Sequence, residues 1–316
     1  MHMGRLVYLL PLSALLGTFA ADAGAQDNDL KPRLYGRLNI SEVLNRPETG
    51  GHDPEFVSNA SRLGIAGSLP FSDSLQIVYQ AEYEIDLDHG RFGSGLTSQR
   101  NTYLGLSGGF GTLLAGKHDT PTKLIQNRVD LFNDLRGDIR ALVVAENRPN
   151  DTLYYASPEF GGFEVAFAAI VDGQSGMYDR LTRSTSTSIS FTEGSWYAAV
   201  AVDNNVNGFD VIRLVSQYSV GDLQLGALYE RSEHATNNRG EQDGFVLSAA
   251  YTLDRWVLKA QGGASDQRVD GGREYSLGAD YLLNDDSRLF GFATFSRSDV
   301  RANDNDQYGL GYEYRF

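Results

Sequence analysis

The segment LQIVYQAEYEIDL, residues 75–87, alternates between apolar and polar side chains. Its odd-numbered positions hold Leu, Ile, Tyr, Ala, Tyr, Ile and Leu, whereas most of its even-numbered positions hold Gln, Glu or Asp. Successive side chains of a β-strand point to opposite faces, so this period of two predicts a strand with one apolar and one polar face.

The same alternation recurs to the end of the chain, and no amphipathic helical pattern stands out beyond one loop. The repeats are separated by seven short turns, at residues 69–74, 108–109, 158–162, 193–194, 221–222, 253–255 and 284–287. Eight longer polar segments alternate with them, at residues 44–59, 88–98, 118–150, 172–183, 203–208, 233–243, 265–272 and 298–306. Sixteen antiparallel strands joined in this way are typical of an outer-membrane β-barrel, so an all-β fold is predicted.

The composition excludes several classes of protein. The chain has 316 residues, no cysteine and a net charge of −14. The absence of cysteine excludes a disulfide scaffold and cysteine-based zinc or catalytic sites. The acidic balance argues against a nucleic-acid partner, which would require a basic face. At 41% hydrophobic residues, the chain is too polar for a bundle of transmembrane helices.

The first 25 residues have the pattern of a secretory signal peptide. Arg5 precedes an apolar run at residues 6–20, and Ala23-Gly24-Ala25 forms a small-residue cleavage site. The alternative is a membrane anchor, but the run is short and contains Pro11. We therefore expect export, cleavage before Gln26, and a single barrel domain at residues 26–316.

Alternation alone does not distinguish a membrane barrel from a soluble β-sandwich, but the chemistry of the two faces does. The apolar face is rich in Tyr and Phe near strand ends, as an interfacial girdle would be. The opposite face holds charges along the strands, including Glu82, Glu84, Arg213 and Lys259. A closed barrel also satisfies every backbone polar group in lipid, which an open sheet cannot do.

Short motifs along the chain resemble those of Gram-negative general diffusion porins. They are Tyr35-Gly36-Arg37-Leu38, Ser61-Arg62-Leu63-Gly64-Ile65-Ala66-Gly67, Arg100 with Tyr103-Leu104-Gly105-Leu106, Gly109-Phe110-Gly111-Thr112, Ala115-Gly116-Lys117, YYASPEFGGF at 154–163, and Tyr312-Glu313-Tyr314-Arg315-Phe316. Each motif is weak by itself, but their number and order make the resemblance strong. It covers essentially all of residues 33–316.

The resemblance implies a sixteen-stranded homotrimeric barrel in the outer membrane, whose third extracellular loop folds inward. That loop would be 118–150, the longest connector. The implied partners are outer-membrane lipid and lipopolysaccharide, periplasmic chaperones, the barrel-assembly machinery, and small hydrophilic solutes and ions. The terminal Tyr312, Tyr314 and Phe316 would form the C-terminal assembly signal.

The energetics of the bilayer predict which residues line the pore. A lipid-facing Arg or Lys at the bilayer midplane costs about 2–4 kcal/mol, so basic residues within strands should face the lumen. This rule places six side chains inward, namely Arg37, Arg62, Arg100, Lys117, Arg213 and Lys259. Strand 99–107 fits poorly, because an inward Arg100 also turns Leu104 and Leu106 inward. A bulge or a slipped face is expected there.

In the resembling porins, a cluster of wall arginines opposes acidic residues on the inward loop. Arg37, Arg62 and Arg100 match the arginine positions, and Lys117 stands where the family usually has Arg. The loop candidates for the acidic side are Asp130, Asp134 and Asp138. The alternative is that these charges are solvated lumen residues of no special role. Ion selectivity stays open, because the loop carries five acidic and five basic residues.

The strand pattern and the resemblance to porins together predict a water-filled channel for passive diffusion. A substrate-selective porin is the first alternative, although most Tyr and Phe fall on the outward face and leave no aromatic ladder in the lumen. An outer-membrane barrel enzyme is the second. The His residues show no metal-ligand spacing, and none lies on a strand where it could serve a nucleophile, so we expect no catalytic residue, no metal and no cofactor. Whether a divalent cation binds the outer loops stays open.

Overall fold

The computed structural model describes residues 32–92, 99–171, 184–234, 240–268 and 271–316. The expected signal peptide at residues 1–25 lies outside these ranges. Within them, no helix is long and apolar enough to cross a membrane.

Strands make up almost all of the regular structure. They are β1 (Arg33–Pro47), β2 (Pro54–Ser58), β3 (Ser61–Ser72), β4 (Leu75–Ile85), β5 (Gln99–Gly108), β6 (Gly111–Lys117), β7 (Thr152–Ala156), β8 (Phe163–Ile170), β9 (Thr185–Glu193), β10 (Trp196–Val206), β11 (Phe209–Val220), β12 (Leu223–His234), β13 (Glu241–Leu253), β14 (Trp256–Ser265), β15 (Gly272–Leu282), β16 (Ser287–Arg297) and β17 (Asn305–Arg315). Among the described residues, the helical pieces are α1 (Pro121–Leu124) and the 3-10 turns Ile139–Ala141 and Arg301–Asn303.

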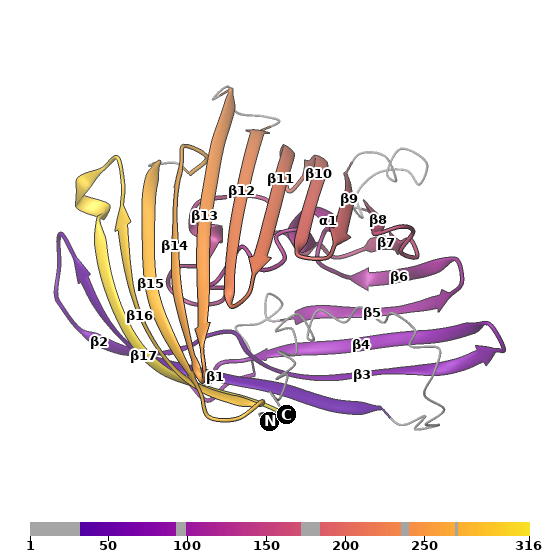
Figure 1. The fold of residues 1–316 in the computed structure, drawn as a ribbon, viewed down its shortest axis with the longest axis horizontal. Coiled ribbons are helices and arrows are strands. Elements are labelled where there is room, and N and C mark those ends of the chain that lie inside the picture. The colour runs from indigo at the N-terminus through magenta and orange to yellow at the C-terminus, as the bar shows by residue number, and fades with distance from the viewer. Residues whose placement is uncertain (1–31, 93–98, 172–183, 235–239, 269–270) are drawn as a thin grey trace, which may run out of the picture.

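The strands form one closed antiparallel barrel (Figure 1). From β3 to β17 each strand pairs with the next one along the chain, and β17 closes the sheet by pairing with β1 from Arg37–Arg315 to Pro47–Asn305. Both β2 and β3 pair with β1, so they are two halves of one strand, interrupted where Ala60 has a φ of +48°. The seventeen segments therefore make sixteen barrel strands, as the sequence predicts.

The two faces of the wall differ as the alternation predicts. In β11, Val211, Arg213 and Val215 are buried toward the interior, whereas Ile212 and Leu214 are exposed on the outside. Aromatic pairs mark the strand ends near short turns, with ring centroids 4.5–4.9 Å apart. These pairs are Phe163–Phe191, Trp196–Tyr218 and Trp256–Tyr281. Such an outer face suits lipid contact with an interfacial aromatic girdle.

The irregularity expected in strand 99–107 is a β-bulge in β5. Tyr83 pairs with Gln99, but Ala81 pairs with Thr102, so β5 holds one extra residue opposite β4. The bulge reverses the face on which side chains lie. Arg100 is thereby buried inside, while Leu104 is 60% exposed on the outer face.

One predicted long connector is a tight turn. Residues 203–208 were expected to form a polar loop, but β10 continues to Val206 and β11 begins at Phe209. Asn207 and Gly208 have φ values of +53° and +81°. An Asn-Gly pair with two positive φ angles is the preferred two-residue hairpin turn, and it makes a longer loop unnecessary. Much of the expected connector 44–59 is likewise strand, in β1 and β2.

Loop 118–150 lies inside the barrel, against the inner face of the wall (Figure 1). It contains α1 and the 3-10 turn Ile139–Ala141, and most of its apolar side chains are buried. This segment brings charged side chains close to the inner wall.

Candidate functional site: the loop and the charged inner wall

The two ends of loop 118–150 are fastened together beside β5. The His118 and Thr120 amides donate to the carbonyls of Pro149 and Asn147. Asp119 lies between Lys123 and Arg148, with N···O distances of 3.1 and 2.9 Å. Burial alone would raise the pKa of the Asp119 carboxyl, but these two cations hold it below its usual range. The base of the loop is therefore a fixed structure.

Glycines in the wall make room for apolar side chains of the loop. A Cβ on Gly278 would lie 2.8 Å from the Phe132 ring, and one on Gly263 would lie 2.6 Å from Leu142. A Cβ on Gly226 would lie 3.1 Å from Val129. Phe132 and Val129 are fully buried in these positions. We call Gly226, Gly263 and Gly278 the glycine sockets, because they let the loop lie close to the wall.

The Gly278→Ala variant tests the glycine sockets. The added methyl group would overlap the Phe132 ring, and such overpacking costs about 1–3 kcal/mol. We expect a lower thermal unfolding temperature and faster proteolytic cleavage within loop 118–150. The matched control is Gly109→Ala in the β5–β6 turn, where a Cβ would meet no atom within 4 Å. Equal proteolysis of the two variants would contradict the role given to Gly278.

Arg213 of β11 binds loop 118–150 from the inner face of the barrel wall. Its guanidinium donates to Glu230 (2.7 Å), to Glu146 of the loop (2.8 Å) and to the Thr122 carbonyl (3.1 Å). Glu230 in turn accepts the amide of Val144 at 2.7 Å. Arg213 and Glu230 are both 0% exposed. A buried cation thus joins two strands to both halves of the loop.

Arg37 and Arg62 meet the loop at Asp134. Their Nη2 atoms donate to the same oxygen, Oδ2 of Asp134, at 2.7 and 2.9 Å. Burial alone would raise the pKa of Asp134, but Arg37 and Arg62 hold it well below the usual range. Asp134 therefore stays ionised, and its two ion pairs fix the middle of the loop to β1 and β3.

Arg100 lies next to this group but binds other partners. Its Nε donates to Glu82 at 2.7 Å, and its Nη1 donates to Glu84 at 3.3 Å. Glu82 also lies 3.7 Å from Arg62, which links the two arginines through one carboxylate. The three sequence-predicted arginines are thus brought together on the wall, two on the loop acid and one on acids of β4.

The ion pairs continue around the inner wall as a chain of alternating charge, which we call the charged belt. In order it contains Lys259, Asp280, Arg288, Glu313, Arg37, Asp134, Arg62, Glu82, Arg100 and Glu84, with successive N···O distances between 2.5 and 3.8 Å. Sequence reasoning missed Asp280, Arg288 and Glu313. Their inward positions follow from strand alternation, but their pairing depends on the register between strands.

The other two predicted loop acids, Asp130 and Asp138, form hydrogen bonds within the loop and not with the wall arginines. Asp130 accepts the Phe132 amide and the Asn133 side chain, both at 3.2 Å. Asp138 caps the 3-10 turn by accepting the Arg140 amide, and it also accepts the Asp134 amide at 2.8 Å. Both side chains shape the loop, and of the three candidates only Asp134 contacts the wall arginines.

Lys117 is not brought to the arginines. Leu113 and Ala115 are exposed on the outer face, and strand alternation puts Lys117 on that same face. Its Nζ donates to the Asn150 side chain at 2.8 Å. Lys117 is the last residue of β6, so the rule that strand cations face the lumen constrains it least. Near the membrane interface the cost of a lipid-facing cation falls to about 0–1 kcal/mol.

Comparison with known proteins supports the fold and identifies the family. The model of the Gram-negative porin family matches residues 12–316. The chain belongs to the Gram-negative porin family. It is therefore an outer-membrane porin, a water-filled channel for passive diffusion of small hydrophilic solutes and ions.

Individual relatives are distant. Outer membrane porin protein 32 of Delftia acidovorans is 24% identical, over 76% of this porin and 75% of the relative. The monosaccharide porin of a Halomonas species is 23% identical, over 96% and 98% of the two chains. The solved anion-selective porin from Comamonas acidovorans has the same fold, with a TM-score of 0.75 at 20% identity, over 90% of this porin and 99% of that chain.

Many Tyr and Phe side chains of the porin are exposed on the outer face, as expected, but a few aromatic side chains face inward. His118 lies between Tyr103 and Tyr154, with ring centroids 5.3 and 4.3 Å away. The Tyr103 hydroxyl donates to Gln80, whose amide donates to Tyr35. Tyr35, Gln80, Tyr103 and Tyr154 come from β1, β4, β5 and β7, and His118 begins loop 118–150, so together they form a patch on one side of the interior.

The C-terminal residues close the porin barrel. Phe316 exchanges backbone hydrogen bonds with Gly36, at 2.9 and 3.1 Å. A Cβ on Gly36 would lie 2.5 Å from the Phe316 ring, so only glycine leaves room for the ring at this seam. Tyr312, Tyr314 and Phe316 are all exposed on the outer face.

Proposed function

We propose that this porin is a general diffusion channel whose constriction is formed by loop 118–150 and the charged belt. The observation that carries the proposal is the pair of hydrogen bonds from Arg37 and Arg62 to Asp134. These bonds hold an acidic loop residue against basic residues of the wall inside the barrel. Ordered opposite charges along a narrow wet passage act on every solute that crosses it.

In this proposal the residues have different roles. Arg37, Arg62 and Arg100 supply the positive side of the constriction, and Asp134 supplies the negative side. Asp130 and Asp138 maintain the shape of the loop. Lys117 takes no part. Because acidic and basic side chains alternate along the belt, their fields largely cancel beyond a Debye length of about 8–10 Å. We therefore propose weak ion selectivity.

We further propose that the protein catalyses no reaction. The pattern Gly105-Leu106-Ser107-Gly108-Gly109 matches a nucleophile elbow, but that motif requires a strand followed by a helix. Here Ser107 lies in the hairpin of β5 and β6, and its hydroxyl is 2.9 Å from that of Thr112. A serine held between two strands in this way lacks the exposed geometry of a nucleophile.

A trimeric assembly within the outer membrane is also proposed. Glu42 of β1 is exposed on the outer face, paired across the strands with Phe56 and Leu310, which are 64% and 75% exposed. An acidic side chain facing lipid is unfavourable, and contact with a second subunit would remove it from lipid. The mass of the purified protein in mild detergent should be three times that of one chain. The mass of one chain would contradict the proposal.

A substrate-selective porin is the second candidate, favoured by the inward Tyr103, His118 and Tyr154 and by the similarity to a monosaccharide porin. Liposome swelling with sugars of increasing size separates the two. General diffusion predicts rates that fall smoothly with solute size and do not saturate with concentration. Saturating uptake of one sugar, lost in Tyr103→Ala, would favour the selective channel.

Deletion of Phe316 should impair assembly. The deletion removes two backbone hydrogen bonds and an aromatic contact at the seam between β17 and β1. If the terminal residues are also the signal read by the assembly machinery, we expect at least tenfold less folded protein in outer-membrane fractions. Phe160, which is 85% exposed in a turn, provides the control substitution Phe160→Ala. Equal yields from the deletion and the wild type would count against this role.

A further inference from the structure

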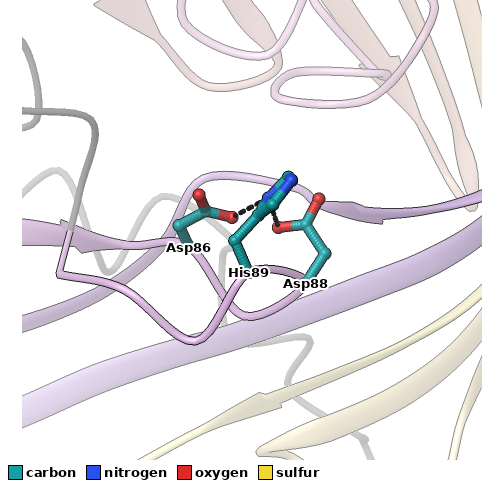
Figure 2. A group of neighbouring side chains, drawn as sticks. All are labelled: Asp86, Asp88 and His89. Atoms are coloured by element: carbon teal, nitrogen blue, oxygen red, sulfur yellow. Dashed lines mark hydrogen bonds and ion pairs between the residues drawn. The ribbon is translucent and has the colours of Figure 1, made fainter.

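Three metal-ligating side chains converge in the turn that follows β4. The donor atoms of Asp86, Asp88 and His89 all lie within 4.8 Å of one another. Figure 2 shows the His89 ring between the two carboxylates. The carboxylates are about four-fifths covered, whereas the His89 side chain is 62% exposed. The two carboxylates are therefore mostly covered by protein, and the imidazole side of the cluster is open to solvent.

The distances within the cluster are those of His–Asp hydrogen bonds or ion pairs, and they are also close to the distance between two ligands of one zinc ion. His89 Nδ1 lies 3.2 Å from Asp86 Oδ1 and 3.3 Å from Asp88 Oδ1. Zinc binds oxygen and nitrogen at about 2.0–2.1 Å in tetrahedral geometry, which separates two ligands by about 3.3 Å. The two observed separations match the edges of such a tetrahedron.

The turn orients Asp86 through atoms other than the oxygen that contacts His89. The Asp86 amide donates to the Arg91 carbonyl at 2.8 Å, and the Arg91 amide donates back at 3.0 Å. The Arg91 guanidinium donates to Oδ2 of Asp86 at 3.1 Å, which leaves Oδ1 facing His89. Arg91 thus orients a ligand from outside the cluster, as outer hydrogen bonds do in metal sites.

We propose that Asp86, Asp88 and His89 bind a divalent transition-metal ion, with zinc as the representative case. The ligands are Asp86 Oδ1, Asp88 Oδ1 and His89 Nδ1, and water completes the shell on the exposed side. The imidazole sets the class of ion, because calcium and magnesium prefer shells made only of oxygen. The expectation of no metal was based on the spacing between histidines, and this proposal departs from it because one histidine lies beside two aspartates.

A zinc titration of the purified full-length protein in detergent, against a chromophoric chelator, tests the proposal. We expect one saturable zinc ion per chain, with affinity lowered about tenfold or more in His89→Ala and in Asp88→Ala. The matched control is His52→Ala, which removes another exposed loop histidine and should bind zinc as the wild type does. Heat-modifiable gel migration checks that each variant is folded.

Two results would overturn the proposal. Unchanged zinc affinity in folded His89→Ala would show that the imidazole is not a ligand. Displacement of zinc by an equal concentration of calcium would show an oxygen-only site of the wrong class. Neither result would affect the proposed diffusion channel, because the cluster and the constriction share no residue.

Discussion

Replacing Arg213 by Ala is expected to lower the stability of the folded protein more than any other single substitution considered. Arg213 is 0% exposed and neutralises Glu230 and Glu146 together. Removing one member of a buried ion pair leaves an uncompensated charge, at a cost of about 3–5 kcal/mol. The strand ladders remain, so we expect a folded barrel with a lower unfolding temperature, a protease-sensitive loop and noisier channel currents.

The matched control for Arg213→Ala is Arg231→Ala on the neighbouring strand. Arg231 also contacts two carboxylates, those of Asp243 and Glu241, but its side chain is 43% exposed. Water screens such pairs, so their removal changes stability little. The comparison keeps the residue type and the charge change the same and varies the burial. Similar unfolding temperatures for the two variants would show that Arg213 does not hold the loop.

The second large effect is expected for Arg62→Glu. The substitution reverses one charge beside Asp134 and Glu82, so the constriction becomes more negative. The change from Arg to Glu is two units of charge. Each unit at about 4 Å in water changes an ion's energy by about 1 kcal/mol, so we expect a change of about 2 kcal/mol, a factor of about thirty in relative permeability. We expect the reversal potential in a potassium chloride gradient to move toward the potassium equilibrium potential.

Arg255→Glu is the control for this change, because it alters net charge equally in the exposed turn between β13 and β14. Its reversal potential should stay close to that of the wild type. The Arg62→Gln variant removes the charge without introducing repulsion against Asp134, so it should move the reversal potential less than Arg62→Glu, in the same direction. An unmoved potential in both Arg62 variants would place Arg62 outside the ion path.

The barrel was predictable from the sequence because each of its strands and turns is specified by a few neighbouring residues. Alternation with period two fixes which side chains face inward, and turn chemistry fixes most connections. Two further features of the structure follow from the same local rules. Leu113, Ala115 and Lys117 share one face by alternation alone, and Asn207-Gly208 is a hairpin turn by composition.

The contacts of the loop were not predictable in the same way. Asp130, Asp134 and Asp138 have the same chemistry, and four-residue spacing does not tell which one meets Arg37. That choice depends on the three-dimensional path of the loop, which the glycine sockets and the anchoring Arg213 determine. Likewise, Arg100 faces inward only because β5 has a bulge, and a bulge shifts every later side chain to the other face.

The most direct test of the account is planar-bilayer recording of the purified wild-type protein. A water-filled barrel narrowed by an ordered loop predicts large, stepwise and ohmic conductance increments, which occur in groups of three if the assembly is a trimer. The recording should be made on protein that shows heat-modifiable gel migration, which establishes that the barrel is folded. Conductance increments from such protein are the predicted result, and their absence from correctly folded protein would contradict the channel.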